Sequence, residues 1–286
     1  MATLRDVKRR IRSVQNTRQI TKAMEMVSAA KLRRAQARVE KARPYADKMQ
    51  LILDNLSAAS GAVAHPFFEK REVKKTTLVL VTSDRGLCGS FNNNLIRRGE
   101  SFLSEYDLEA VELVCVGKKG FNYYGKRQYP IVFSIDDFGG NLDLAKVRRL
   151  SHELTSRFLS GTTDEVHLLF ARFISTTRQR ITLEKFLNIE QEKQDTAAGR
   201  LDYIFEPDPE SIYDDLMPRY AMMKIQMALA ESFASEHAAR MVAMGGATRN
   251  AEEMVDHLIL VRNKARQASI TKELLDIVSG VEALQK

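Results

Sequence analysis

Long apolar runs are missing from this sequence of 286 residues, and cysteine is scarce. No run of 18 or more apolar residues occurs, so no segment is of the kind that spans a membrane as a helix. The first residues also lack the basic, then apolar, then small-residue succession of a secretory signal. We therefore expect a soluble protein that stays in the compartment where it is made.

The residues that carry chemistry are also few and badly spaced for it. The two cysteines, Cys88 and Cys115, lie in or beside apolar runs without CxxC spacing, which favours reduced thiols in a cytosolic setting over a disulfide. The five histidines show no HxxxH or HExxH spacing, and no GxSxG elbow is present. The sequence therefore predicts no catalytic site, no metal and no cofactor.

Charge, by contrast, is plentiful and unevenly placed. Residues 1–43 hold 13 Lys or Arg against 3 Asp or Glu, whereas residues 184–215 hold 10 acidic against 3 basic residues. A solvated helix surface would explain such runs, and so would a basic face that meets an acidic partner. Nucleic-acid binding is an alternative for the basic end, but no aromatic stacking residues accompany the positive charge.

A heptad repeat runs without a slip from Leu4 to Leu56. This spacing predicts one long helix packed against another in coiled-coil fashion, with a mild kink at Pro44. Between Arg18 and Ser28 the seam becomes polar, while Ile20, Met24 and Val27 form a neighbouring apolar stripe. One heptad position of the seam is occupied by Leu4, Ile11, Arg18, Glu25, Leu32, Val39, Ala46 and Leu53. The other is occupied by Val7, Val14, Thr21, Ser28, Ala35, Ala42, Met49 and Leu56.

The other end of the chain predicts a second long helix, from residue 209 to 286, with a bend or close approach at Gly245 and Gly246. Its apolar positions form two successive seams. These are Met254, Leu258, Val261, Ala265 and Ala268, and then Ile270, Leu274, Ile277, Val281 and Leu284.

Between the helices, short β-branched runs alternate with helical patterns, which is typical of an α/β domain with a mainly parallel sheet. We expect strands at 76–84, 111–117, 130–134 and 165–173, helices at 91–105, 119–127 and 142–159, an edge strand within 178–189 and a loop at 190–200. The predicted organisation is a helix at 1–58, a Rossmann-like α/β domain at 59–208 and a helix at 209–286. The two helices should pair as an antiparallel coiled coil around the inserted domain.

The loop "SDRGLCGSFNNN" (Ser83–Asn94) follows the first strand and opens a helix, which is where phosphates bind in dinucleotide folds. Its two glycines fit neither GxGxxG nor the P-loop pattern. The alternative is a tight turn in which Asp84 and Arg85 form a local ion pair.

Several motifs resemble the gamma subunit of F-type ATP synthases, the rotor shaft, over nearly the whole chain and in the same order. They are "IRSVQNTRQITKAMEMVSAAKLRRAQ", "TSDRGLCGSFN", "DYIFEPDP", "SEHAARMVAMGGAT" and "NKARQASITKELLDIVSG". Val281 stands where that family usually has Ala. The resemblance implies a central-stalk subunit without a catalytic site of its own, which transmits torque between a membrane rotor ring and the catalytic ring.

The resemblance also implies partner contacts. Lys22, Met24 and Met26, with Arg240, would lie by the acidic lever loops of the catalytic subunits. Loops of the alpha and beta ring higher up would be contacted by Arg266, Gln267 and Thr271, and the seam from Ile270 to Leu284 would turn in an apolar bearing. At the foot, Tyr203, Phe205 and Glu206 would face the membrane c-ring.

Further expectations concern the rest of the complex. The α/β domain would hold the epsilon subunit, and the chain would reach the cytoplasmic face of a bacterial cell membrane only through the complex. The cysteine insert of chloroplast members is absent, so thiol control is not expected.

Overall fold

The computed structural model describes residues 3–60, 65–69, 71–189 and 208–284. By packing, the chain divides into two compact units. One comprises Met1–Val27 with Met241–Lys286, and the other Ser28–Arg240. This grouping differs from the predicted division by element type, because residues 28–60 and 209–240 of the long helices pack with the sheet.

Two long helices dominate the structure. Helix α1 runs from Leu4 to Ser60 and helix α5 from Pro209 to Leu284, each with a proline inside it, Pro44 and Pro218. Both begin at a side-chain cap. The hydroxyl of Thr3 accepts the backbone N–H of Asp6 at 3.2 Å, and the carboxylate of Asp208 accepts that of Ser211 at 2.9 Å. These caps satisfy amides that a helix start leaves without partners.

The predicted heptad of α1 is confirmed. Every seam position from Leu4 to Leu56 is buried or half-buried, including the polar positions Arg18, Thr21, Glu25 and Ser28. Within the unit of residues 1–27 and 241–286, α1 and α5 run antiparallel, since Thr21 contacts Thr248 while the earlier Arg18 pairs with the later Glu252. The polar section therefore keeps the phase of the seam.

The seam predicted around Met254 was wrong at its two ends, whereas Leu258, Val261 and Ala265 are half-buried as predicted. Met254 is 53% exposed and Ala268 is exposed, whereas the buried positions of this part of α5 follow a seam one residue further on. That seam contains Met244, Thr248, Ala251 and Val255, with Leu258 half-buried. The phase is set by Thr248, which pairs with Thr21, and a polar anchor of this kind is invisible to a search for apolar spacing.

The inserted part is a five-stranded sheet with the order β3-β2-β1-β4-β5. Its strands lie at the predicted places: β1 Thr76–Val81, β2 Val111–Val116, β3 Ile131–Ile135, β4 Glu165–Phe173 and β5 Gln179–Leu187. The first four are parallel, and β5 pairs antiparallel with β4 at the edge. Strands β1 and β2 are buried at every position, which explains their continuous apolar runs.

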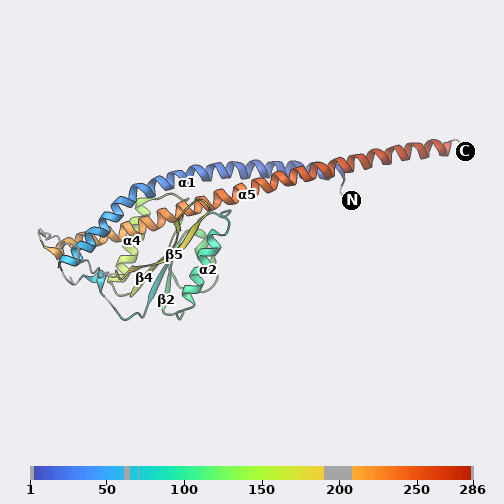
Figure 1. The fold of residues 1–286 in the computed structure, drawn as a ribbon. Coiled ribbons are helices and arrows are strands. Elements are labelled where there is room, and N and C mark those ends of the chain that lie inside the picture. Colours follow the sequence, from blue (N-terminus) through green and yellow to red (C-terminus); the bar gives the residue numbers. More distant parts are fainter. Residues whose placement is uncertain (1–2, 61–64, 70, 190–207, 285–286) are drawn as a thin grey trace. The chain divides into compact units, whose positions relative to one another are not determined.

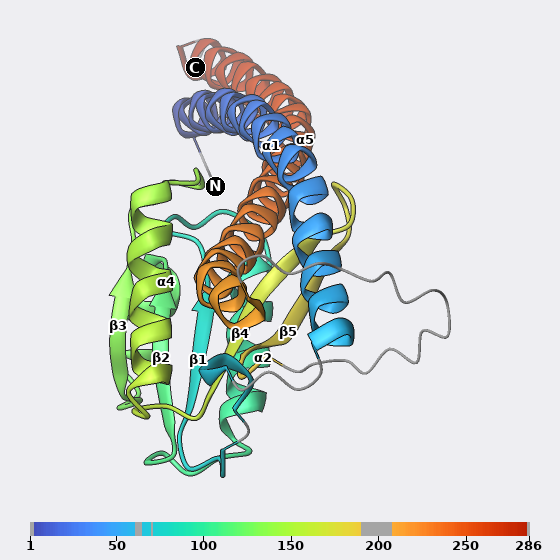
Figure 2. The same cartoon turned by 90° about the vertical axis from the view of Figure 1, so that its left-hand side faces the viewer.

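Helices cover both faces of the sheet, as Figures 1 and 2 show for the unit of residues 28–240. Helices α2 (Phe91–Leu103) and α3 (Lys118–Tyr124) cover one face, and their core includes Leu78, Leu80 and Leu113. The other face packs against α4 (Leu144–Leu159) and against parts of α1 and α5, around Val79, Val81 and others. The short 3-10 helix η1 (Pro66–Phe68) adds Phe67 to this second core. The α/β architecture predicted from the sequence is thus confirmed.

Candidate functional site

Asp84 organises the loops at the carboxyl ends of β1, β2 and β3. Its carboxylate accepts the backbone N–H groups of Lys118 at 3.3 Å, Asp137 at 3.2 Å and Gly139 at 3.0 Å. In the part of the chain that the structure describes, no ion pair joins Asp84 to Arg85, so the local pair expected from the sequence was wrong. The carboxylate instead joins loops that are 34 to 55 residues away along the chain.

Arg240 of α5 binds the loop that follows β1 through hydrogen bonds. Its guanidinium donates to the carbonyl oxygens of Gly86 at 3.3 Å and Arg85 at 3.1 Å, and pairs with Glu236 at 2.8 Å. Both side chains are buried. Burial raises the pKa of Glu236, while the positive charge of Arg240 lowers it.

Helix α5 thus crosses the edge of the sheet at which open α/β folds bind ligands. The hydroxyl of Ser235 donates to the carbonyl of Ala171 at the end of β4, at 2.9 Å. Lys31 of α1 donates to the carbonyl of Gly139 at 3.2 Å. The loop considered for phosphate binding is occupied by protein groups, namely the guanidinium of Arg240 and an amide from α2, since Asn92 accepts the backbone N–H of Ser83 at 3.0 Å.

His237 and Gly140 form a second tight contact at this edge. His237 Nε2 donates to the carbonyl of Gly140 at 3.0 Å, and the imidazole is 1% exposed. Burial lowers the pKa of His237 to about 4, and the charges of Arg240 and Lys31 act in the same direction. Gly140 has a φ of +74°, and a Cβ there would lie 2.4 Å from two atoms of the ring.

The polar seam positions Arg18, Thr21 and Glu25 lie in the unit of residues 1–27 and 241–286. The Thr248 hydroxyl donates to that of Thr21 at 2.9 Å, and Thr21 donates to the carbonyl of Arg18 at 3.0 Å. Glu25 lies beside Gly245, where an added Cβ would be 3.5 Å from its carboxylate. Gly245 is therefore a position of close approach, as predicted, within a continuous helix.

The predicted ring-contact residues on α1 point away from this polar seam to different degrees. Lys22 is exposed and pairs with Glu25 at 3.2 Å, Met26 is 59% exposed and Met24 is half-buried. Ile20 and Val27 are also exposed, so an apolar stripe does lie outside the seam. Arg240 belongs to the other unit and is buried against the loop described above, so it is not exposed as these residues are.

Towards the end of α5, residues 266–275 and 277–280 are all exposed. Arg266, Gln267 and Thr271 are exposed, as are five large apolar side chains, which we call the tip residues: Ile270, Leu274, Leu275, Ile277 and Val278. Exposed apolar side chains in such density mark a surface that a partner covers. The predicted foot residues Tyr203, Phe205 and Glu206 lie outside the described residues.

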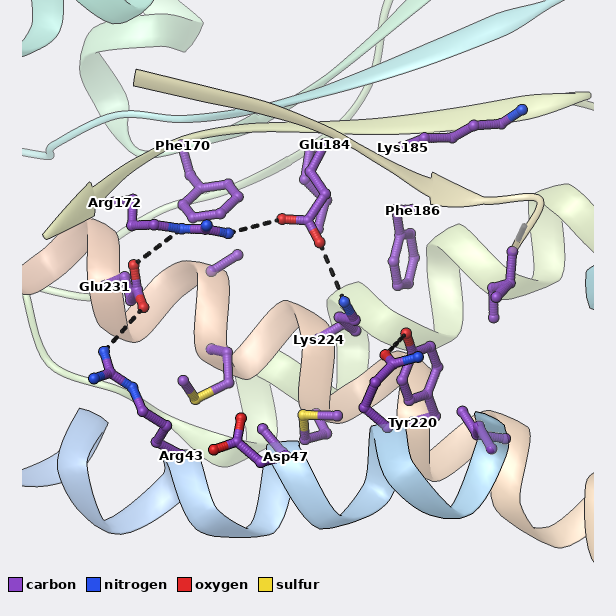
Figure 3. A pocket seen from close by; sticks show the side chains of 18 of the residues that line it. Arg43, Asp47, Phe170, Arg172, Glu184, Lys185, Phe186, Tyr220, Lys224 and Glu231 are labelled. Carbon is purple, nitrogen blue, oxygen red and sulfur yellow. Dashed lines mark hydrogen bonds and ion pairs between the residues drawn. The ribbon is translucent and has the colours of Figure 1, made fainter. Parts of the chain in front are cut away.

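A cavity of about 630 Å³ lies in the unit of residues 28–240, between α1, the strands β4 and β5, and α5. Figure 3 shows charged side chains that cross it in an alternating series, which we call the charge ladder. The series is Arg43, Glu231, Arg172, Glu184 and Lys224, with successive ion-pair distances of 3.7, 3.6, 3.2 and 3.2 Å. Apolar side chains, including Phe170, Phe186, Met223 and Met227, complete the lining.

Sequence reasoning missed the contacts that Asp84 makes with distant loops, and it missed Glu236 and the charge ladder. The stretch "MALAESFASEHAAR" (Met227–Arg240) did carry a signal, because two glutamates interrupt a run of small and apolar residues. Such residues are rarely buried without a partner. Glu236 pairs with Arg240 four residues further along α5, within the same stretch. The partners of Glu231, however, are Arg43 on α1 and Arg172 on β4, so only the folded chain identifies them.

The structure therefore defines two parts, a pair of antiparallel helices and a Rossmann-like domain in which α5 occupies the edge of the sheet where open α/β folds bind ligands. Among the described residues, no cluster of His, Cys, Asp and Glu could hold a metal ion, and no helix carries an apolar stretch long enough to cross a bilayer. A family profile described as ATP synthase matches residues 3–284. The chain belongs to the ATP synthase gamma-chain family, as this profile and full-length relatives named ATP synthase gamma chain show.

Two curated relatives support this assignment over their full length. The ATP synthase gamma chain of Moorella thermoacetica is 49% identical over 287 residues, and that of Protochlamydia amoebophila is 44% identical over 285 residues. In each case the alignment covers 100% of both chains. The family indicated by the sequence motifs is thereby confirmed.

Solved structures confirm the fold. A chain from the central stalk and c-ring of the Tetrahymena thermophila mitochondrial ATP synthase has a TM-score of 0.63 at 26% identity, over 80% of this chain and 99% of that one. A chain from the Euglena gracilis mitochondrial enzyme in rotational state 3 has a TM-score of 0.71 at 21% identity, over 98% and 94%.

Proposed function

We propose that the chain is the central-stalk rotor shaft of a bacterial F-type proton-translocating ATP synthase. The observation that carries the proposal is the density of exposed apolar side chains on the last part of α5, in a member of the gamma-chain family. A surface of this kind needs an enclosing partner, and a ring of catalytic-complex subunits around the helix would supply one.

The proposed partners follow from the relatives and from the chemistry of the surface. The solved neighbours come from assemblies described as F1 with c-ring and as central stalk with c-ring. We assign the tip residues, with Arg266, Gln267 and Thr271, to the alpha and beta subunits of the ring. Lys22, Met24 and Met26 are assigned to acidic loops of the catalytic subunits, because the basic end of α1 complements acidic side chains.

The proposed role of Arg240 depends on the loop after β1, to which it is hydrogen-bonded. Its guanidinium is engaged by Arg85, Gly86 and Glu236, so we propose that it holds that loop in place for a catalytic subunit. Tyr203, Phe205 and Glu206 are assigned to the membrane c-ring and the α/β domain to epsilon. Through these partners the chain would sit peripherally at the cytoplasmic face of the cell membrane.

The mechanism requires no chemistry in this chain. Proton flow would turn the c-ring and with it the shaft, which would present different faces to the three catalytic sites in turn. A contact shifts an equilibrium only if it binds two conformations unequally. Rotation of an asymmetric shaft would thus become a cyclic change in the nucleotide affinity of each site.

Coexpression of the full chain with the alpha and beta subunits tests this proposal. We expect the chain to copurify with the ring and to raise its ATPase activity. A chain that stays monomeric beside an assembled ring would contradict the proposal. Binding to DNA or RNA at submicromolar affinity and physiological salt, without binding to the ring, would favour the nucleic-acid alternative instead.

Met24→Lys tests the proposed contact on α1. The new ammonium can pair with an acidic loop and hold the shaft at one angle, so we expect proton pumping per ATP hydrolysed to fall. Ala37→Lys, which adds the same charge at an exposed position elsewhere on α1, is the control. Equal coupling in the two variants would remove Met24 from the contact surface.

A further inference from the structure

The cavity crossed by the charge ladder has the properties of a ligand site that the rotor function does not use. Its volume of about 630 Å³ lies within the range of small-molecule pockets. Its walls come from three layers, with Arg43 and Asp47 on α1, Phe170 and Glu184 on the sheet, and Met223 among the residues on α5. A molecule bound there would contact all three layers at once.

The cations of the cavity already have carboxylate partners. Arg43 pairs with Glu231, while Arg172 and Lys224 both pair with Glu184. The remaining one, Lys185, pairs with Glu165 at 2.6 Å outside the lining. An anionic ligand would therefore have to displace a carboxylate that belongs to the protein.

Two carboxylates of the cavity, those of Glu231 and Asp47, can accept further hydrogen bonds. Glu231 is 9% exposed, and its buried Oε2 accepts no hydrogen bond, since Arg172 Nε lies 3.6 Å away. A buried oxygen without a donor is costly, which makes a hydrogen-bond donor from a ligand favourable. Asp47 extends from α1 into the same space, as Figure 3 shows, and among the described residues no ion pair engages it.

The rest of the lining suits an apolar body. Phe170, Phe186, Met223 and Met227 face the cavity, and methionine adapts its shape to irregular ligands. Tyr220 presents a further aromatic ring, although its hydroxyl is engaged by Gln50 at 2.8 Å. Aromatic faces attract ammonium groups as well as apolar ones.

From this geometry we propose that the cavity binds an amphipathic organic cation, with a primary ammonium at Glu231 and Asp47 and an aryl or alkyl body against the aromatic and methionine side chains. The proposal rests on the cavity alone and is independent of the rotor function.

Methyl NMR of the full chain labelled with [methyl-13C]methionine tests the site, because Met223 and Met227 line the cavity. The signals of these two methyl groups are assigned by substituting each methionine with leucine. The probes are 4-phenylbutylamine, the neutral 4-phenylbutanol and the anionic 4-phenylbutanoate, which share one body. We expect the amine to shift both methyl signals saturably, with a Kd below 1 mM and at least tenfold tighter than that of either other probe. An alcohol or acid that binds as well as the amine, or an amine that shifts neither signal, would overturn the proposal.

Two variants locate the ammonium. Glu231→Gln keeps the shape of the side chain and is expected to weaken amine binding at least tenfold. Asp47→Asn changes an exposed position that the fold does not need, so its expected loss of several-fold stays measurable even if Glu231→Gln unfolds the chain. Glu109→Gln, at an exposed loop position away from the cavity, should bind as the unaltered chain does. Unchanged affinity in Asp47→Asn together with Glu231→Gln would contradict the assignment.

Discussion

In the turn after β3, Gly140 adopts a left-handed backbone beside the buried imidazole of His237. We expect Gly140→Ala to cost about 3 kcal/mol of unfolding free energy, because strain at this φ adds to a collision with the ring. Gly139→Ala is the matched control, since Gly139 also has a positive φ of +56° but nothing within 4 Å of an added Cβ. It should cost about 1 kcal/mol.

Urea-induced unfolding of the two variants measures the difference. The gap between them isolates the contact with His237 from the backbone strain that both share. Equal losses would show that the imidazole moves aside without cost, and so would contradict a fixed Gly140–His237 contact.

His237 also predicts how stability depends on pH. Its pKa is about 4 in the folded chain and about 6.5 when unfolded, so the unfolded chain binds the extra proton between these values. The stability that depends on neutral His237 is fully present above about pH 6.5 and is lost as the pH falls toward 4, by about 3 kcal/mol.

The contribution of His237 is measured as a difference between variants. Gln keeps a hydrogen-bond donor and does not titrate, so His237→Gln should lose less stability between pH 6.5 and 4 than the unaltered chain. His152→Gln, at an exposed histidine of α4, should keep the original pH dependence. Parallel curves for His237→Gln and the unaltered chain would mean that His237 is protonated without opening the fold.

At the scale of elements, the two long helices are joined in their polar section by the hydroxyl pair of Thr21 and Thr248. Valine has the shape of threonine without the hydroxyl, so Thr21→Val and Thr248→Val should each cost about 1 kcal/mol. Each remaining hydroxyl still bonds a backbone carbonyl of its own helix. The double variant should therefore be more stable than the sum of the single losses predicts, with a coupling of about 1 kcal/mol.

A double-mutant cycle from unfolding curves measures this coupling. Thr17→Val combined with Thr248→Val serves as the reference cycle, because Thr17 is exposed and its hydroxyl donates to the carbonyl of Ser13 in its own helix. A coupling no larger than in the reference cycle would mean that the polar section does not hold the helices together.

The elements also show which features the sequence could predict. The seam of α1 follows from its spacing of 3.5 residues, and the strands follow from short β-branched runs, which in β1 and β2 are continuous because these strands are buried at every position. The phase of α5 near Met254 could not be predicted, since Thr248 fixes it through a contact 227 residues away along the chain. Asp84 was equally hidden, because its three partners are brought together only by the order of the strands.

At the scale of the whole molecule, substitutions of the tip residues should affect assembly with the ring but not the stability of the isolated chain. Leu274→Gln with Ile277→Gln changes two exposed side chains, so the unfolding free energy of the isolated chain should change by no more than about 0.5 kcal/mol. If a ring covers them, as proposed, losing two buried apolar side chains should weaken its affinity at least tenfold. Copurification with the alpha and beta subunits at graded concentrations measures this loss.

Two control variants are needed to interpret the loss of ring affinity. Val255→Gln changes a buried seam position and should destabilise the isolated chain by about 2 kcal/mol or more. Leu260→Gln changes a side chain that is as exposed as the tip residues but lies outside them. Undiminished ring affinity in the tip variant would place the bearing elsewhere on the chain.

The uninterrupted heptad of α1 has one further consequence. A strict seven-residue repeat winds paired helices into a left-handed supercoil, because it falls short of two full helical turns. Twisting such a pair in one sense tightens the winding and presses the seam together, whereas the opposite sense opens it. We therefore expect a shaft of this kind to resist twisting differently in the two senses, and to store different elastic energy when driven in the direction of synthesis and in that of hydrolysis.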